Sequence, residues 1–262
     1  GSMQVAGAIH LVTPSIRFRN GYSASATLQA QGGDGGDAGG LNVVPNLYFA
    51  MPLNPQWSVG VGLNAPWGLV TEYDDGWAGR FLAVKSDIKT INVNPGASFK
   101  VNDNLALGFG INYQRLQATL TNRVNYSAAL VSAGVAAGSV PSGLESNVEV
   151  KGDDTGLGWN VGLLWEINKD RRLGVHYRSS ISYDVSGGVT FTNPAVPAAL
   201  AAAATAVNNG VLFNSGITAK LKLPPIVNLS YYGAVTPRWD IMTDAQWTGW
   251  STIKDLTFVR DS

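Results

Sequence analysis

The chain has 262 residues with 18 basic and 18 acidic side chains, so its formal net charge at pH 7 is zero. Charged residues make up 14% of the chain, against about 25% in an average globular domain. The charge balance excludes a basic nucleic-acid-binding protein, and the lack of cysteine excludes disulfide frameworks, zinc clusters and cysteine nucleophiles. The 31 glycines and the aromatic fraction of 10% favour many bent strands and a surface that is not built for water. No apolar run reaches the roughly 18 residues of a transmembrane helix.

Alternation of apolar with small or polar residues recurs along the chain, and this is the period of a strand with two different faces. The alternation is clear at 57–64, 105–114, 157–167 and 172–184. We expect nine strands at about 3–19, 42–53, 56–69, 83–101, 104–122, 149–167, 171–185, 217–235 and 238–258. Most of these are longer than the five or six residues usual in soluble proteins.

The connections between these strands are alternately short and long. Short turn signals lie at 54–55, 102–104, 168–170 and 236–237, and long connections lie at about 20–41, 70–82, 123–148 and 186–216. This asymmetry is typical of outer-membrane barrels, and Trp57, Trp165 and Trp239 beside the short turns would form an aromatic girdle. The sequence therefore predicts an all-β fold, a transmembrane antiparallel up-and-down β-barrel. The alternative is a soluble barrel or sandwich with long strands.

Two of the long connections contain alanine-rich segments, 126–137 and 194–207, which predict short helices. Pro197 suits the first turn of the second helix. Apolar helices on outer loops need a ligand or a partner to cover them. They either form a hydrophobic capture groove or pack on each other and close the mouth of the barrel. The predicted lining of the groove is Leu130, Val131, Val135, Val196 and Leu200.

Cations on strands are the candidates for contact with an anionic headgroup. We predict four of them on inward faces, where one could anchor a carboxylate: Arg115, Arg178, Lys220 and Lys222. An equally good interpretation is a salt-bridge network with Asp184, Glu149 or Asp240. In the strand at 56–69, Pro66 and several glycines predict a kink, although the glycines could simply relieve curvature.

Residues for bond chemistry are few. The two histidines, His10 and His176, have no nucleophile elbow nearby, so we expect no enzyme. The glycine-rich stretch 32–40 is a flexible outer loop rather than a calcium loop, because its two aspartates lack the further ligands at fixed offsets. The acidic residues at 72–75 either bind a cation or belong to a structured loop in which Arg80 pairs with a carboxylate. We expect no resident metal and no cofactor.

Several motifs occur in one order along the chain. They are VPNLYF at 44–49, NAPWGL at 64–69, TEYDDGWAGR at 71–80, INVNP at 91–95, GVHYRS at 174–179 and WTGWS at 247–251. With these motifs the chain resembles the outer-membrane long-chain fatty-acid transporter family (FadL/TodX type, OMPP1). The resemblance implies a fourteen-stranded barrel with an N-terminal hatch near an Asn-Pro-Ala motif. It also implies that ligands pass from a groove between two loops into the lumen and leave sideways through a kinked strand, which favours the groove interpretation.

The sequence departs from this pattern at both ends. No Asn-Pro-Ala motif precedes Met3, and the final strands of the family do not follow Phe258. Nine strands cannot close an even-stranded barrel, and an open edge in lipid is costly. We therefore expect a single barrel domain over 1–262 that is incomplete at both ends, and a monomer when full length.

The predicted function is an outer-membrane channel that takes up long-chain fatty acids or other hydrophobic compounds by passive diffusion. The alternative is a general diffusion porin, although porins normally have dense opposing charge at their constriction, which this chain lacks. The expected partners are hydrophobic small molecules, outer-membrane lipid and lipopolysaccharide. No nucleic acid is expected.

Overall fold

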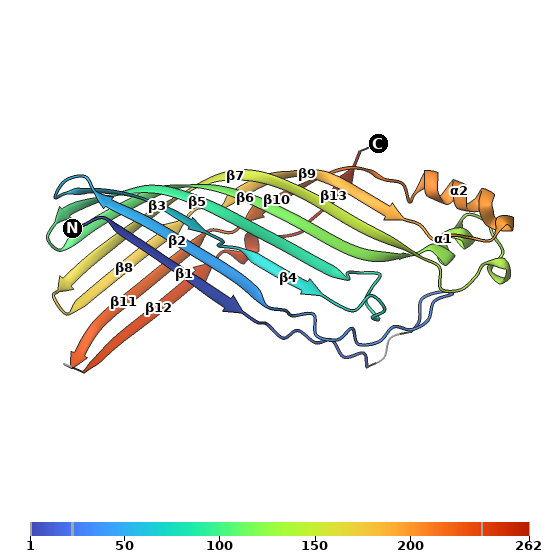
Figure 1. The fold of residues 1–262 in the computed structure, drawn as a ribbon, viewed down its shortest axis with the longest axis horizontal. Helices are drawn as coiled ribbons and strands as arrows, with labels where there is room; N and C mark the ends of the chain where they lie inside the picture. The colour runs from blue at the N-terminus through green and yellow to red at the C-terminus, as the bar shows by residue number, and fades with distance from the viewer. Residues whose placement is uncertain (1, 22–23, 237, 262) are drawn as a thin grey trace.

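The chain forms one antiparallel sheet that curls into an open half-barrel (Figure 1), in a computed structural model that describes residues 2–21, 24–236 and 238–261. The sheet has 13 strands among these residues. In chain order they are β1 (Gln4–Val12), β2 (Asn42–Pro52), β3 (Trp57–Asn64), β4 (Gly68–Glu72), β5 (Lys85–Asn102), β6 (Leu105–Asn125), β7 (Glu145–Asn168), β8 (Arg171–Arg178), β9 (Ile181–Thr192), β10 (Ser215–Leu223), β11 (Ile226–Thr236), β12 (Trp239–Thr248) and β13 (Phe258–Arg260). The predicted all-β, antiparallel, up-and-down architecture is confirmed.

Interruptions divide three of the nine predicted strands in two, which corrects their boundaries. They lie at 65–67 between β3 and β4, at 179–180 between β8 and β9, and at 224–225 between β10 and β11. Prolines at 66, 224 and 225 carry no N–H for the ladder, which explains two of the three. The strand predicted at 3–19 ends at Val12, shortly before Pro14, and the one predicted at 238–258 pairs only as far as Thr248. Residues 22–23 of the first predicted loop and residue 237 of the last predicted turn lie outside the described residues.

Short turns gather at one end of the half-barrel and long loops at the other, as predicted (Figure 1). Between them the side chains alternate strictly. On β6, Asn112 and Gln114 are buried on the concave face, whereas Phe109, Ile111 and Tyr113 on the convex face are each more than half exposed. Neighbouring strands continue this apolar convex band with Val61, Leu63, Trp159, Val161, Val175 and Leu229. An apolar band on the outside of a curved sheet is what a lipid-facing wall requires.

The outer part of the sheet branches. β7 pairs with β8 along its half near the short turns and with β9 near the long loops. β10 then pairs with β9 on one edge and with the short strand β13 on the other. An interruption separates β9 from β8, and another separates β10 from β11. The faces to which the side chains of β9 and β10 point are therefore set by the interruptions and not by continuous alternation from β8 and β11.

Both alanine-rich loops form helices, as predicted. They are α1 (Tyr126–Ser132) and α2 (Ala201–Gly210), with single 3-10 turns at Ala137–Ser139, Ala198–Leu200 and Trp250–Thr252. Pro197 precedes the turn that leads into α2. No helix in the described part of the chain is long and apolar enough to cross a membrane.

Candidate functional site

The two loop helices pack on each other and enclose an apolar core at the outer end of the half-barrel. Leu130 of α1 is fully buried, and Leu200 before α2 is 7% exposed. Tyr126 lies in the same core, where its hydroxyl donates to Asn208 Oδ1 at 2.7 Å and burial raises its pKa. The other core members are Val140, Ala204, Val207 and Leu212. The remaining predicted lining residues, Val131, Val135 and Val196, are partly buried at the margin of this core, so only the margin offers apolar surface to a ligand.

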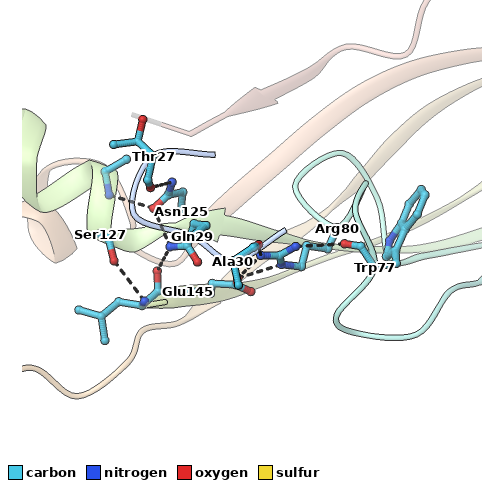
Figure 2. Close-up of polar contacts among 10 residues, drawn as sticks. Thr27, Gln29, Ala30, Trp77, Arg80, Asn125, Ser127 and Glu145 are labelled. Carbon is cyan, nitrogen blue, oxygen red and sulfur yellow. Dashed lines mark hydrogen bonds and ion pairs between the residues drawn. The ribbon is translucent and has the colours of Figure 1, made fainter. Parts of the chain in front are cut away.

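Arg80, from the loop between β4 and β5, joins three outer segments (Figure 2). Its guanidinium donates to Glu145 at the start of β7 at 2.8 Å, to the Trp77 carbonyl at 3.2 Å and to the Ala30 carbonyl at 3.1 Å. Arg80 is 5% exposed, so this ion pair is shielded from solvent. The sequence analysis gave a structured loop with Arg80 paired to a carboxylate as one of two interpretations of the acidic residues at 72–75, and it offered no signal that the partner would be Glu145.

Gln29 and Asn125 fasten the N-terminal loop onto the start of α1 (Figure 2). The Gln29 amide donates to Asn125 Oδ1 at 2.9 Å and to the Leu144 carbonyl at 3.0 Å. Asn125 donates in turn to the Thr27 carbonyl at 2.8 Å, and its Oδ1 accepts the Ala128 backbone N–H as the helix cap. We call this set of contacts, together with those of Arg80, the outer clasp. The sequence analysis did not identify Gln29 or Asn125.

The concave face is apolar in its outer half. Leu116 of β6 packs against Ile181, Tyr183 and Val185 of β9, and all four are nearly inaccessible. Further members of this apolar lining are Val148, Val189, Ile217, Ala219 and Leu223. Side chains at 156 and 158 would collide with Ile181, so glycine at these positions lets β9 lie close over β7.

Nearer to the short turns, the same face carries a layer of buried polar side chains. Asn92 Nδ2 donates to Asn112 Oδ1 at 3.1 Å and to Asn64 Oδ1 at 3.3 Å. Arg178 donates to Gln114 Oε1 at 2.5 Å. Asn112 Nδ2 and Gln114 Nε2 are buried without a hydrogen-bond partner among the described residues, which is uncommon for amide donors. This polar layer lies directly below Leu116, because Gln114 and Leu116 are successive concave positions of β6.

Of the four predicted inward cations, only Arg178 lies on the concave face. Arg115 shares the convex face with Tyr113 and pairs with Asp153 at 3.1 Å, because odd positions of β6 point outward. Lys220 and Lys222 also point outward, opposite Asp184 and Ser182 of β9. The prediction was wrong for Lys220 and Lys222 because the interruptions at 179–180 and 224–225 each shift the alternation of inward and outward side chains by one residue.

The interruption at 65–67 leaves β2 and β4 unpaired with each other. The β2–β3 ladder ends at Leu47 opposite Leu63, and within the described residues β4 pairs with β5 alone. Thr90 of β5 holds the break, because its hydroxyl accepts the Trp67 N–H at 3.0 Å and donates to the Trp67 carbonyl at 2.8 Å. The Trp67 ring packs against the apolar lining and meets Trp250 edge-on, with ring centroids 5.4 Å apart.

The convex face carries an apolar band, the concave face is apolar in one half and polar in the other, and the strand pairing is broken at 65–67. Together these features define the wall of a membrane-spanning β-barrel through which solutes pass. The chain belongs to the outer membrane protein transport protein family (OMPP1/FadL/TodX), whose model matches residues 1–261. The members of this family are outer-membrane transport channels rather than enzymes, and the chain is an outer-membrane protein.

Individual relatives agree with this assignment. The long-chain fatty acid transport protein of Escherichia coli O6:H1 is 31% identical over 229 residues, which are 84% of this chain and 51% of that protein. Outer membrane protein P1 of Haemophilus influenzae strain Rd is 28% identical, over 85% of this chain and 50% of that protein. The chain thus spans about half the length of the curated relatives it matches.

Two crystal structures share the fold. A Pseudomonas aeruginosa FadL homologue superposes with a TM-score of 0.73 at 24% identity, covering 98% of this chain and 62% of the other. The Pseudomonas putida toluene transporter TodX gives 0.68 at 20% identity, covering 99% and 64%. At these identities the likeness concerns the fold alone.

Proposed function

We propose that this chain is the part of an outer-membrane channel through which long-chain fatty acids or other hydrophobic compounds enter by passive diffusion. The observation that carries this proposal is the apolar lining, which ends at a polar layer beside the break at 65–67. An apolar solute is stabilised by contact with the lining and destabilised by displacing polar partners further in. The break next to Trp67 therefore gives it a lower-energy route sideways than the path through the polar layer. The similar proteins include a long-chain fatty acid transport protein and a toluene transporter, and both names are consistent with apolar cargo.

Capture begins at the loop helices in this proposal. Val131, Val135 and Val196 at the margin of the α1–α2 core would make the first contacts with the ligand. Leu130 and Leu200 are enclosed, so they join the groove only when α1 and α2 separate. The outer clasp holds the N-terminal loop against the start of α1.

A fatty acid also brings a carboxylate, and Arg178 is the predicted cation that faces the concave side. It has no carboxylate partner in the described part of the chain, and two unpartnered amide donors belong to its neighbours Asn112 and Gln114. A carboxylate placed there would accept charge-assisted hydrogen bonds from Arg178 and a further bond from Gln114 Nε2. Arg115, Lys220 and Lys222 take no part in this role because they face outward.

A β-sheet that spans a lipid bilayer also needs a hydrogen-bonding partner strand along each of its edges. β1 and β12 lie at the two ends of the strand path, and each has only one strand neighbour among the described residues. Unpaired backbone groups cost several kcal/mol each in hydrocarbon. We therefore propose that the chain works as one wall of a larger, closed, monomeric barrel.

The proposal is tested in the complete barrel protein by oleate binding and by liposome swelling with sugars. Val189 of the apolar lining is buried, and Val189→Thr replaces a methyl group by a hydroxyl at nearly constant shape. An unpaired hydroxyl in an apolar site costs about 1–3 kcal/mol, so oleate affinity should fall at least several-fold. Thr190→Val, next along β9 on the opposite face, is the matched control and should leave oleate binding unchanged.

The porin alternative predicts a different pattern. A porin would swell sugar-filled liposomes and bind no oleate saturably, whichever residue stands at 189. That outcome would refute the transporter proposal and favour the porin.

A further inference from the structure

A belt of charged side chains follows the apolar band on the convex face. It begins where β6 passes from Tyr113 to Arg115, on the side of the long loops. Most of its cations have a carboxylate partner on the same face. These pairs are Lys89–Asp87 at 2.8 Å, Arg115–Asp153 at 3.1 Å and Lys151–Glu149 at 2.7 Å. The belt therefore neutralises itself over β5, β6 and β7.

β10 is different. Lys220 and Lys222 are exposed on the convex face, two residues apart, and neither forms an ion pair within the residues the structure describes. The neighbouring segment 252–257 leads into the short strand β13 on the edge of β10 and brings Lys254 into the same cleft. The three lysines line one open cleft of about 390 Å³ together with Asp184 and Asp255. Three positive charges against two negative ones leave this cleft with a surplus of one positive charge.

The height of this cleft on the wall indicates its ligand. Tyr177 of β8 is a last apolar convex position before the interruption at 179–180, and the cleft lies on β9 and β10 directly after that interruption. Lysines just beyond an apolar band lie at the level of lipid headgroups, where their flexible stems reach the interface. An ammonium group binds phosphate as a point charge, and the hydroxyls of Ser182 and Thr252 in the same cleft are further hydrogen-bond donors.

We propose that Lys220, Lys222 and Lys254 form a binding site for the phosphorylated headgroup of an outer-leaflet glycolipid, lipopolysaccharide. Lys220 and Lys222 point away from the transport route, because they lie on the opposite face of the sheet from the apolar lining, although Tyr183 of that lining also borders the cleft. Its occupant is a lipid rather than a free ion, since the cleft opens onto the surface directly beyond the lipid-facing band. Binding would anchor the β9–β10 hairpin at a fixed height in the membrane.

The test compares Lys220→Gln/Lys222→Gln with Lys89→Gln/Lys151→Gln in the complete barrel protein in detergent. Both double variants remove two positive charges from the same belt, but only the first removes lysines without ion-pair partners. Binding of purified lipopolysaccharide is titrated for each, and for the parent with dephosphorylated lipopolysaccharide. We expect Lys220→Gln/Lys222→Gln to lose at least about tenfold in affinity. The control variant should bind like the parent, and the parent should bind the dephosphorylated lipid as weakly as the first variant does.

Three outcomes would overturn the proposal. Equal losses in both double variants would mean that total charge alone attracts the lipid. Unchanged binding of Lys220→Gln/Lys222→Gln would mean that the cleft is not the site. Competition by millimolar inorganic phosphate as strong as that by the lipid would identify an ion site. Lys220→Arg/Lys222→Arg, which retains the charge, should bind within a few-fold of the parent and guards against a folding defect. Oleate binding should stay unchanged in all these variants, so failure here would leave the transport proposal standing.

Discussion

Removal of the Arg80 guanidinium should loosen the outer clasp and leave the rest of the wall in place. Arg80→Met keeps the length of the side chain but removes its bonds to Glu145, Trp77 and Ala30. The Arg80 side chain is 6% exposed and that of Glu145 is 20% exposed, so the carboxylate would remain desolvated without its partner. Breaking a buried ion pair in this way costs about 3–5 kcal/mol.

Hydrogen exchange followed by mass spectrometry measures this cost locally. Exchange at 27–31 and 76–83 should accelerate by at least about two orders of magnitude in Arg80→Met, because each 1.4 kcal/mol is a factor of ten. Glu145→Gln and the double variant complete a cycle, and the double variant should be less destabilised than the sum of the two single variants. Arg123→Met is the control, since its partner Asp75 is 77% exposed and such a pair contributes at most about 1 kcal/mol. Unchanged exchange in Arg80→Met, or an equal effect of Arg123→Met, would refute the reasoning.

Two further predictions concern single side chains. Arg178→Gln should weaken oleate binding at least tenfold but leave oleyl alcohol binding nearly unchanged, as measured by titration; equal losses for both ligands would remove the headgroup role. Asp37 accepts hydrogen bonds from the Ser15 hydroxyl, then from the Ile16 and Gly39 N–H groups and from Arg17, and these hold its pKa well below the usual value. The contacts stabilise the fold above the unfolded pKa of about 3.9 and are lost only as pH falls through the lower folded pKa. A spin label at position 19 should thus keep the same mobility from pH 7 to about 4 in the parent. Asp37→Asn should raise the mobility of that label at every pH. A rise in label mobility between pH 7 and 5 in the parent would contradict the role of Asp37.

Much of the wall could be predicted because its signal is local. Alternation at 105–113 needs only neighbours two residues apart, and the short turns that join the strands have their own residue preferences. The loop helices were also predictable, since alanine-rich segments favour helix on their own. These features account for the positions of most strands, for the convex band and for the positions of α1 and α2. They did not give the strand count, because interruptions divide predicted strands and the sheet has 13 strands where nine were expected.

The site was harder to predict because it depends on pairs that are distant in sequence. Arg80 and Glu145 are 65 residues apart, and no pattern around Arg80 selects this carboxylate over the nearer aspartates. Lys220 and Lys222 were placed on the wrong face for a different reason. Assigning side chains to a face by alternation fails when a strand is interrupted. The interruption at Ser179–Ser180 contains no proline, unlike the other two interruptions, so the sequence gives no sign of it.

The paired interruptions show why such a shift can persist in a sheet. From Arg178 to Ile181 the chain advances three residues, yet both side chains face the concave side. From Leu223 to Ile226 the neighbouring strand also advances three residues while both side chains face the concave side. Across the ladder, Arg178 lies opposite Ile226 and Ile181 lies opposite Leu223. A shift in one strand alone would place apolar side chains opposite polar ones across the ladder. Because both strands shift at the same level, the cross-strand pairs stay matched, with Ile181 and Leu223 on the concave side and the lysines of β10 on the convex side.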